Sequence, residues 1–158
     1  MNTTQLIDFL KRDKFAKKVF CGVIPIDKLP ISKVKRPCSY IINTHESQKP
    51  GEHWYALYIP RRGYIEYFDS YGIKPINHQI YSFFHANGSK YIYNKIKLQG
   101  VKSTNCGLFS AFFIYFRCRG YSMKQYIKFF ASNKLHNDLF IKSLFKKYKI
   151  YKKIQNNY

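Results

Sequence analysis

The chain has 158 residues, of which 46% are hydrophobic and 19% aromatic, so it is not a disordered polypeptide and favours one globular domain over residues 1–158. Lys and Arg total 28 against 8 Asp and Glu, and the formal net charge of +20 favours nucleic acid, bound through a basic surface, as a partner. Neither an uninterrupted apolar run of transmembrane length nor a secretory signal sequence is visible, so we expect no membrane span and no secretion.

The first half of the chain alternates between helical and extended patterns. A helix is expected from Thr3 or Thr4, either of which could cap it, to about Lys14. The segments that follow are predicted to be a short edge strand and loop at 19–30, a buried strand at 38–43, and a β-hairpin with strands 53–59 and 64–69.

The second half is mainly helical. The predicted elements are a helix at 75–86 that ends at Asn87-Gly88, a strand at 91–98, a helix at 106–119, a helix from the N-cap Ser122 to about Ala131, and a last helix at 137–148. The helix at 106–119 has almost no polar side and must lie in the core. We therefore predict an α+β fold in which a small mixed or antiparallel sheet packs against this buried central helix, with further helices at its flanks.

Cys106 is the first candidate for chemistry. It follows Ser103-Thr104-Asn105, all competent N-cap residues, and directly precedes the buried helix. At a helix N-terminus the free backbone N–H groups and the positive end of the dipole favour the thiolate, which is the form that a sulfur nucleophile needs. The alternative is a small hydrophobic side chain that fills a corner of the core.

His53 and Asp69 supply what such a thiol requires. A thiolate nucleophile needs an imidazole as general acid and base, and the imidazole needs an acceptor that orients it. His53 begins one strand of the predicted hairpin and Asp69 ends the other, so both belong to the same edge of the sheet. The alternatives are an exposed histidine at a strand end and an Asx-turn acceptor before Gly72.

Gln99 completes the candidate site, seven residues before Cys106 in a loop that can fold back over the thiol. Its amide could donate to a developing oxyanion together with the backbone N–H of Cys106. The alternative is a solvated loop glutamine. The four cysteines, at positions 21, 38, 106 and 118, are widely spaced and include no C-x-x-C pair, so no metal site is expected.

These motifs occur in an order that resembles a known family. The motifs are residues 41–44 (IINT), 51–54 (GEHW), 67–72 (YFDSYG), 99–100 (QG) and 105–109 (NCGLF). Their order and spacing resemble the adenovirus endopeptidase (adenain) family, whose clan includes the ubiquitin-like-protein-specific proteases. The resemblance covers about residues 19–116. It implies catalysis by Cys106, His53 and Asp69, with Gln99 and Cys106 at the oxyanion, although the adenovirus enzymes carry Glu in place of Asp69.

The resemblance also implies a biological role. The chain would be a cysteine endopeptidase that processes viral precursor polypeptides, cleaves at Gly-containing sites and acts in the host nucleus or cytoplasm and in the virion. Trp54 would wall the cleft beside His53. No cofactor is required for the chemistry, and DNA is the implied activator. A disulfide-linked peptide activator, known in the family, is not expected, because no cysteine lies between Phe68 and Gln99.

Two other functions fit the same residues. One is a protease that removes ubiquitin-like proteins from their conjugates, with the same four residues and a different docking surface. The other is a non-catalytic module that holds nucleic acid through lysines and aromatic side chains. In each case we expect a monomer.

Overall fold

A five-stranded sheet forms the middle of the molecule. The computed structural model describes residues 2–49 and 51–155, with side chains up to residue 149. The strands, which lie side by side in chain order, are β1 (Phe20–Pro25), β2 (Cys38–Asn43), β3 (Trp54–Ile59), β4 (Ile65–Phe68) and β5 (Tyr91–Tyr93). The β1–β2 and β4–β5 pairs are parallel and the two central pairs are antiparallel. The sheet is therefore mixed, and the predicted hairpin is the β3–β4 pair.

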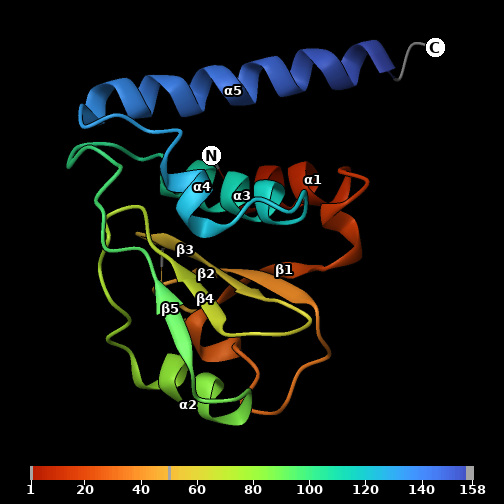
Figure 1. Cartoon of the computed structure of the whole chain (residues 1–158), viewed down its shortest axis with the longest axis vertical. Helices are drawn as coiled ribbons and strands as arrows, with labels where there is room; N and C mark the ends of the chain where they lie inside the picture. Colours follow the sequence, from red (N-terminus) through yellow and green to blue (C-terminus); the bar gives the residue numbers. More distant parts are fainter. Residues whose placement is uncertain (1, 50, 156–158) are drawn as a thin grey trace.

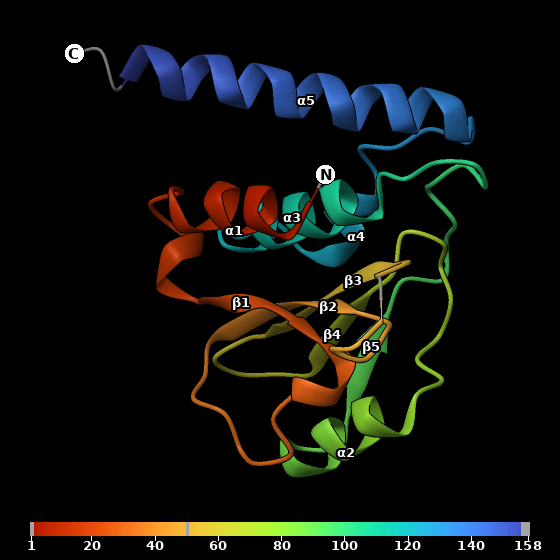
Figure 2. The same cartoon turned by 180° about the vertical axis from the view of Figure 1, so that it is seen from behind.

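Helices cover the two faces of the sheet unequally (Figures 1 and 2). On one face lie α1 (Thr3–Lys11), α3 (Cys106–Arg117) and α4 (Met123–Ile127), and α5 (Lys134–Gln155) crosses the outer side of this layer. The opposite face carries α2 (His78–Ala86). Because side chains alternate along a strand, the sheet separates two hydrophobic clusters, one against α1 and α3 and the other against α2. This arrangement confirms the predicted α+β class.

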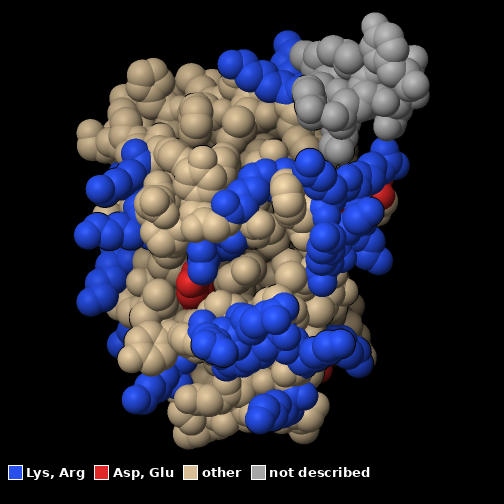
Figure 3. All heavy atoms as spheres, turned by 45° about the vertical axis from the view of Figure 1, so that its right-hand side comes forward, with Lys and Arg blue, Asp and Glu red and all other residues tan. Residues whose placement is uncertain are grey.

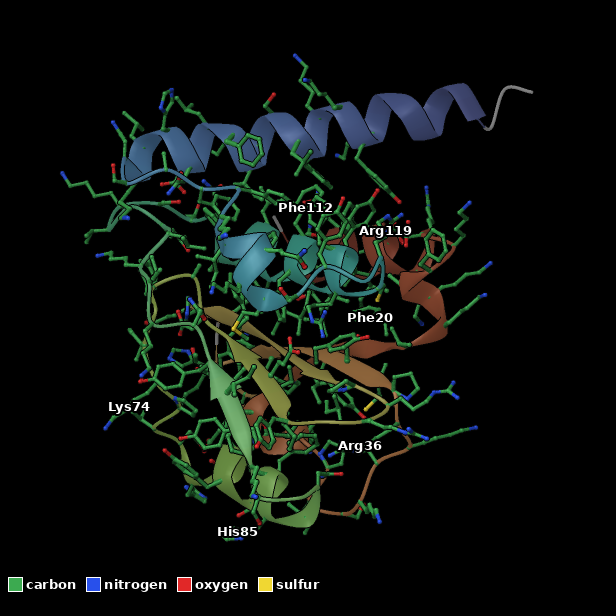
Figure 4. The ribbon with its side chains drawn as sticks, in the orientation of Figure 1. Phe20, Arg36, Lys74, His85, Phe112 and Arg119 are labelled. Atoms are coloured by element: carbon green, nitrogen blue, oxygen red, sulfur yellow. The ribbon has the colours of Figure 1, made fainter. Side chains whose placement is uncertain are left out.

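The centre of the larger cluster is α3, which is buried from Cys106 to Ile114 as its apolar sequence predicts. Phe113 stacks on Phe68 of β4, with ring centroids 4.7 Å apart. On the other side Phe112 meets Phe9 of α1 at 4.8 Å. Figure 4 shows Phe112 inside the helical layer, between the sheet and α5. Aromatic rings thus join the sheet, α3 and α1 into one core.

The first helix is capped differently from the prediction. The N-cap is Asn2, whose Oδ1 accepts from the Gln5 N–H at 2.9 Å while the Gln5 side chain accepts from the Asn2 N–H at 3.2 Å. This reciprocal capping box satisfies two backbone donors and places Thr3 inside the helix. The helix also ends earlier, at Lys11 rather than about Lys14.

The predicted strand at 91–98 is too long. It ends at Tyr93, because Asn94 turns out of the sheet and bonds to the backbone of Asp69. The helix after Ser122 is confirmed with its cap but ends at Ile127. The last helix is longer than predicted, since it begins at Lys134 and continues to Gln155.

The described part of the chain contains neither a membrane-spanning helix nor a cluster of metal-binding side chains. No helix there has the length and hydrophobicity that crossing a lipid bilayer requires. Nor do three or more His, Cys, Asp or Glu side chains come together as metal ligands among those residues.

Candidate active site

The hairpin brings His53 and Asp69 together. In the β3–β4 register Ala56 lies opposite Phe68. His53, just before β3, and Asp69, just after β4, therefore lie at the same end of these two strands. The His53 Nε2 atom lies 3.0 Å from Asp69 Oδ2, and the two side chains are 18% and 4% exposed. A buried carboxylate at this distance fixes the orientation of the ring.

Asp69 is itself held by its neighbours. Its second oxygen, Oδ1, accepts from the Tyr71 N–H at 2.7 Å. The Asn94 side chain accepts from the Asp69 N–H at 2.8 Å and donates to the Asp69 carbonyl at 2.6 Å. No role for Asn94 was predicted from the sequence. Asparagine is unfavourable inside a strand, so it could have indicated that the strand ends before this residue.

The turn after Asp69 requires a glycine. Gly72 has a φ of 71°, and a Cβ there would lie 2.8 Å from the backbone carbon of Ile96. Its N–H donates to the Asp69 carbonyl at 2.8 Å. The close approach of this turn to the 94–98 segment keeps Asn94 against Asp69.

Cys106 begins α3, is 4% exposed, and lies near enough to the His53 ring to affect its pKa. Burial by itself lowers the pKa of His53, but the hydrogen bonds with Asp69 and Cys106, and the charges of these groups, outweigh burial and raise the pKa to about 9. The ring therefore keeps its proton at neutral pH. A protonated imidazole beside a sulfur at a helix N-terminus is an arrangement that stabilises a thiolate.

Gln99 is fully buried in the loop before α3. Its Oε1 accepts from Ser70 Oγ at 2.6 Å, and its Nε2 donates to the Ser103 carbonyl at 2.7 Å. The solvated loop glutamine is thus excluded. One amide hydrogen is bound to Ser103, and the other makes at most a long contact with Ser103 Oγ at 3.3 Å.

Trp54 lies beside the helix that carries Cys106. A Cβ added to Gly107 would lie 3.4 Å from the Trp54 ring, so the indole lies against the first turn of α3. Trp54 lines a hollow of about 210 Å³ with Thr3 and Asn43, whereas His53 and Asp69 line a separate cavity of about 220 Å³.

The four cysteines are free but differ in character. The pKa of the exposed Cys21 is lowered to about 6, chiefly by a hydrogen bond from the neighbouring Cys38 thiol. Burial raises the pKa of Cys118 to about 12. Thiol reactivity alone would therefore not single out Cys106, because Cys21 is exposed and ionises readily.

Comparisons with known proteins give viral relatives. No family model matches the chain. Over 110 residues it is 33% identical to "Cysteine protease S273R" and 32% identical to "SUMO-1 cysteine protease S273R", both from African swine fever virus. Each match covers 60% of this chain and 40% of the relative, so the chain spans about 40% of the length of the curated relatives it matches.

A solved structure shares the fold. The crystal structure of the African swine fever virus pS273R protease superposes with a TM-score of 0.61 at 21% identity, over 84% of this chain and 61% of that one. The narrower resemblance to the adenovirus endopeptidases remains a prediction from the motifs. The chain is thus similar in sequence to viral cysteine proteases and has the α+β fold of one of them.

Proposed function

We propose that the chain is a cysteine endopeptidase domain that cleaves viral precursor polypeptides at Gly-containing sites. The observation that carries the proposal is the His53 ring, which is hydrogen-bonded to the buried Asp69 and whose pKa is raised by both Asp69 and Cys106. A structural histidine has no need of a thiol on one side and a buried carboxylate on the other. The similarity to viral cysteine proteases supports the same conclusion.

Each residue has a role in the proposed reaction. The Cys106 thiolate attacks the scissile carbonyl and forms a thioester, while His53 donates its proton to the leaving amine. Water then hydrolyses the thioester with His53 as the base. Asp69 keeps the ring in place and stabilises its positive charge.

The oxyanion would be held by the Cys106 N–H and the Gln99 amide. The second Nε2 hydrogen of Gln99, which makes only the long contact with Ser103 Oγ, is the one available to substrate. Removal of one such donor costs about 10²–10³ in kcat in comparable sites.

A cleavage assay tests the function. We expect the purified chain to cut peptides that contain Gly-Gly, and Cys106→Ala to lower kcat at least ~10⁴-fold, since the nucleophile is lost. Cys21→Ser is the matched control, and it should retain full turnover despite the acidity of its thiol. Equal turnover by wild type and Cys106→Ala would refute the proposal.

A ubiquitin-like-protein deconjugating activity is the second candidate. It is favoured by the name "SUMO-1 cysteine protease" of two relatives. Both proposed substrate classes would present a Gly-containing cleavage site, and they differ in whether a folded ubiquitin-like domain lies beside it. A SUMO-1 fusion that is cut far faster than an unstructured peptide with the same cleavage sequence would favour the deconjugating enzyme.

Nucleic acid is the proposed partner of the basic surface. Figure 3 shows a face with many Lys and Arg side chains and little acid among them, in keeping with the net charge of +20. If the binding is through phosphates, log affinity for duplex DNA falls linearly with log salt, with a slope of about 0.9 per phosphate neutralised. The cleavage assay repeated with DNA tests activation. Salt-dependent binding by a wild-type chain without any turnover would favour the non-catalytic module.

A further inference from the structure

The loop before α3 is fastened to α5 by one buried carboxylate. Asp138, which is 6% exposed, accepts from the Gly100 N–H at 3.0 Å, from Asn105 Nδ2 at 2.9 Å and from Ser103 Oγ. Figures 1 and 2 both show this loop, residues 99–105, beside the beginning of α5. Asp138 is also the last acid of the sequence, in a segment otherwise rich in lysine.

Through Ser103 the carboxylate reaches Gln99. The Ser103 hydroxyl donates to Asp138, and the Ser103 carbonyl accepts from Gln99 Nε2. The position of the glutamine amide therefore depends on where Asp138 holds Ser103.

Through Asn105 the carboxylate reaches the N-terminus of α3. Asn105 occupies the N-cap position, where an asparagine oxygen normally accepts from the N–H of the second or third helical residue, but no such bond forms here. Its side-chain amide donates to Asp138 instead. The first N–H groups of α3 are thereby left without a side-chain acceptor, as an oxyanion site requires.

The geometry points to Asp138 as the positioning residue of the oxyanion site, which holds the Gln99 amide in place and keeps the Asn105 side chain off the helix N-terminus. This inference rests on the proposed protease function. Its chemistry needs a carboxylate, because Oδ2 accepts from Gly100 and Oδ1 from Ser103 and Asn105. In Asp138→Asn one of the two oxygens becomes an NH₂ group, which cannot accept.

The test separates oxyanion binding from the reactivity of the thiol. In a Cys21→Ser background, kcat and KM for a Gly-Gly peptide are measured together with the affinity for a peptide aldehyde and the rate of alkylation of Cys106 by iodoacetamide. The sulfur adds to the aldehyde carbon, and the former carbonyl oxygen then occupies the oxyanion site. Alkylation displaces iodide and creates no such oxygen.

We expect Asp138→Asn to lower kcat ~10- to 10³-fold, to weaken aldehyde binding by a similar factor, and to leave KM and the alkylation rate within ~3-fold of wild type. The matched control is Asp13→Asn, the same substitution at a carboxylate that is 2% exposed and bonded to Arg119 near the far end of α3. It should lower the melting temperature without changing kcat.

Two results would overturn the inference. One is an unchanged kcat in Asp138→Asn, and the other is an equal fall in kcat and in alkylation, which would mean general distortion. If this variant does not fold, Ser103→Ala serves instead, since it removes one bond to Asp138 and keeps the backbone acceptor of Gln99. We expect it to lower kcat ~3- to 10-fold with alkylation unchanged, and an unchanged kcat would again refute the inference. A wild type that cleaves no peptide would refute the protease function itself.

Discussion

The two ends of α3 use buried carboxylates in opposite ways. At its C-terminal end Arg119 makes a two-bonded ion pair with Asp13, at 2.5 and 3.1 Å, and Arg117 bonds to both oxygens of Glu66 at 2.7 Å. At its N-terminal end Asp138 accepts only from neutral donors, the loop amide, a hydroxyl and a side-chain amide.

The difference follows from what each end must do. Arginines near a helix C-terminus suit the dipole, and their ion pairs with Asp13, just after α1, and with Glu66 of β4 hold the helix against its neighbours. A cation in the place of the neutral donors would draw the carboxylate away from the loop. Under the proposed function, the C-terminal end of α3 stabilises the fold and the N-terminal end leaves backbone N–H groups available to the substrate. Substitutions at the two ends should therefore separate stability from activity.

The largest effect is expected at the N-terminal end. His53→Gln removes the acid that protonates the leaving amine and the positive charge beside Cys106, so kcat/KM should fall ~10³-fold or more. Because the glutamine amide can still donate to Asp69, we expect the melting temperature to fall less than in Asp13→Asn. Steady-state cleavage and thermal unfolding of the same preparation check this, and a fall in stability without a loss of turnover would contradict the assignment.

The converse effect is expected at the C-terminal end. Asp13→Asn leaves Arg119 without its charge partner and should lower the free energy of unfolding by about 3 kcal/mol. Urea unfolding measures this loss. Below the unfolding transition kcat/KM should equal that of wild type, and a lower value would show that the two ends of α3 are coupled.

The pH dependence sharpens the same comparison. The pKa of His53 is raised to about 9, so the ring is protonated at neutral pH and loses its proton only as the pH rises through that value. We expect kcat/KM to fall above pH ~9 rather than near 6.5. In Cys106→Ala, NMR titration of the ring should give a pKa below that of wild type, because Asp69 remains but the sulfur is lost. An unchanged pKa would argue against contact with Cys106.

The smallest effect is expected from a substitution of Tyr55, in the cavity that His53 and Asp69 also line. Tyr55 is 3% exposed, lines the same cavity, and has a hydroxyl that no described residue bonds. A buried hydroxyl without a partner loses its hydrogen bonds to water on folding and gains none in return. Tyr55→Phe should therefore leave the free energy of unfolding unchanged or raise it by up to ~1 kcal/mol. A clear loss of stability in urea unfolding would show that the hydroxyl has a partner.

Much of this molecule was predictable from local pattern. The spacing and runs of apolar residues predicted β2, the β3–β4 hairpin, α2 and the buried α3, because a single hydrophobic periodicity dominates each of these segments. Element ends were less predictable. The strand at Tyr91 was predicted too long because alternation continues past Asn94, and only the bonds of Asn94 to Asp69 reveal the break.

The order of His53, Asp69, Gln99 and Cys106 along the chain was enough by itself to suggest a thiol enzyme, because each residue type has a distinct part in that chemistry. Only the tertiary structure showed that Asp138 faces the loop before α3, that the Asn105 side chain does not cap the helix, and that the pKa of Cys21 is lowered. These relations join residues far apart in the sequence, or depend on which of several available partners a side chain bonds in the folded protein. Periodicity carries no information about either.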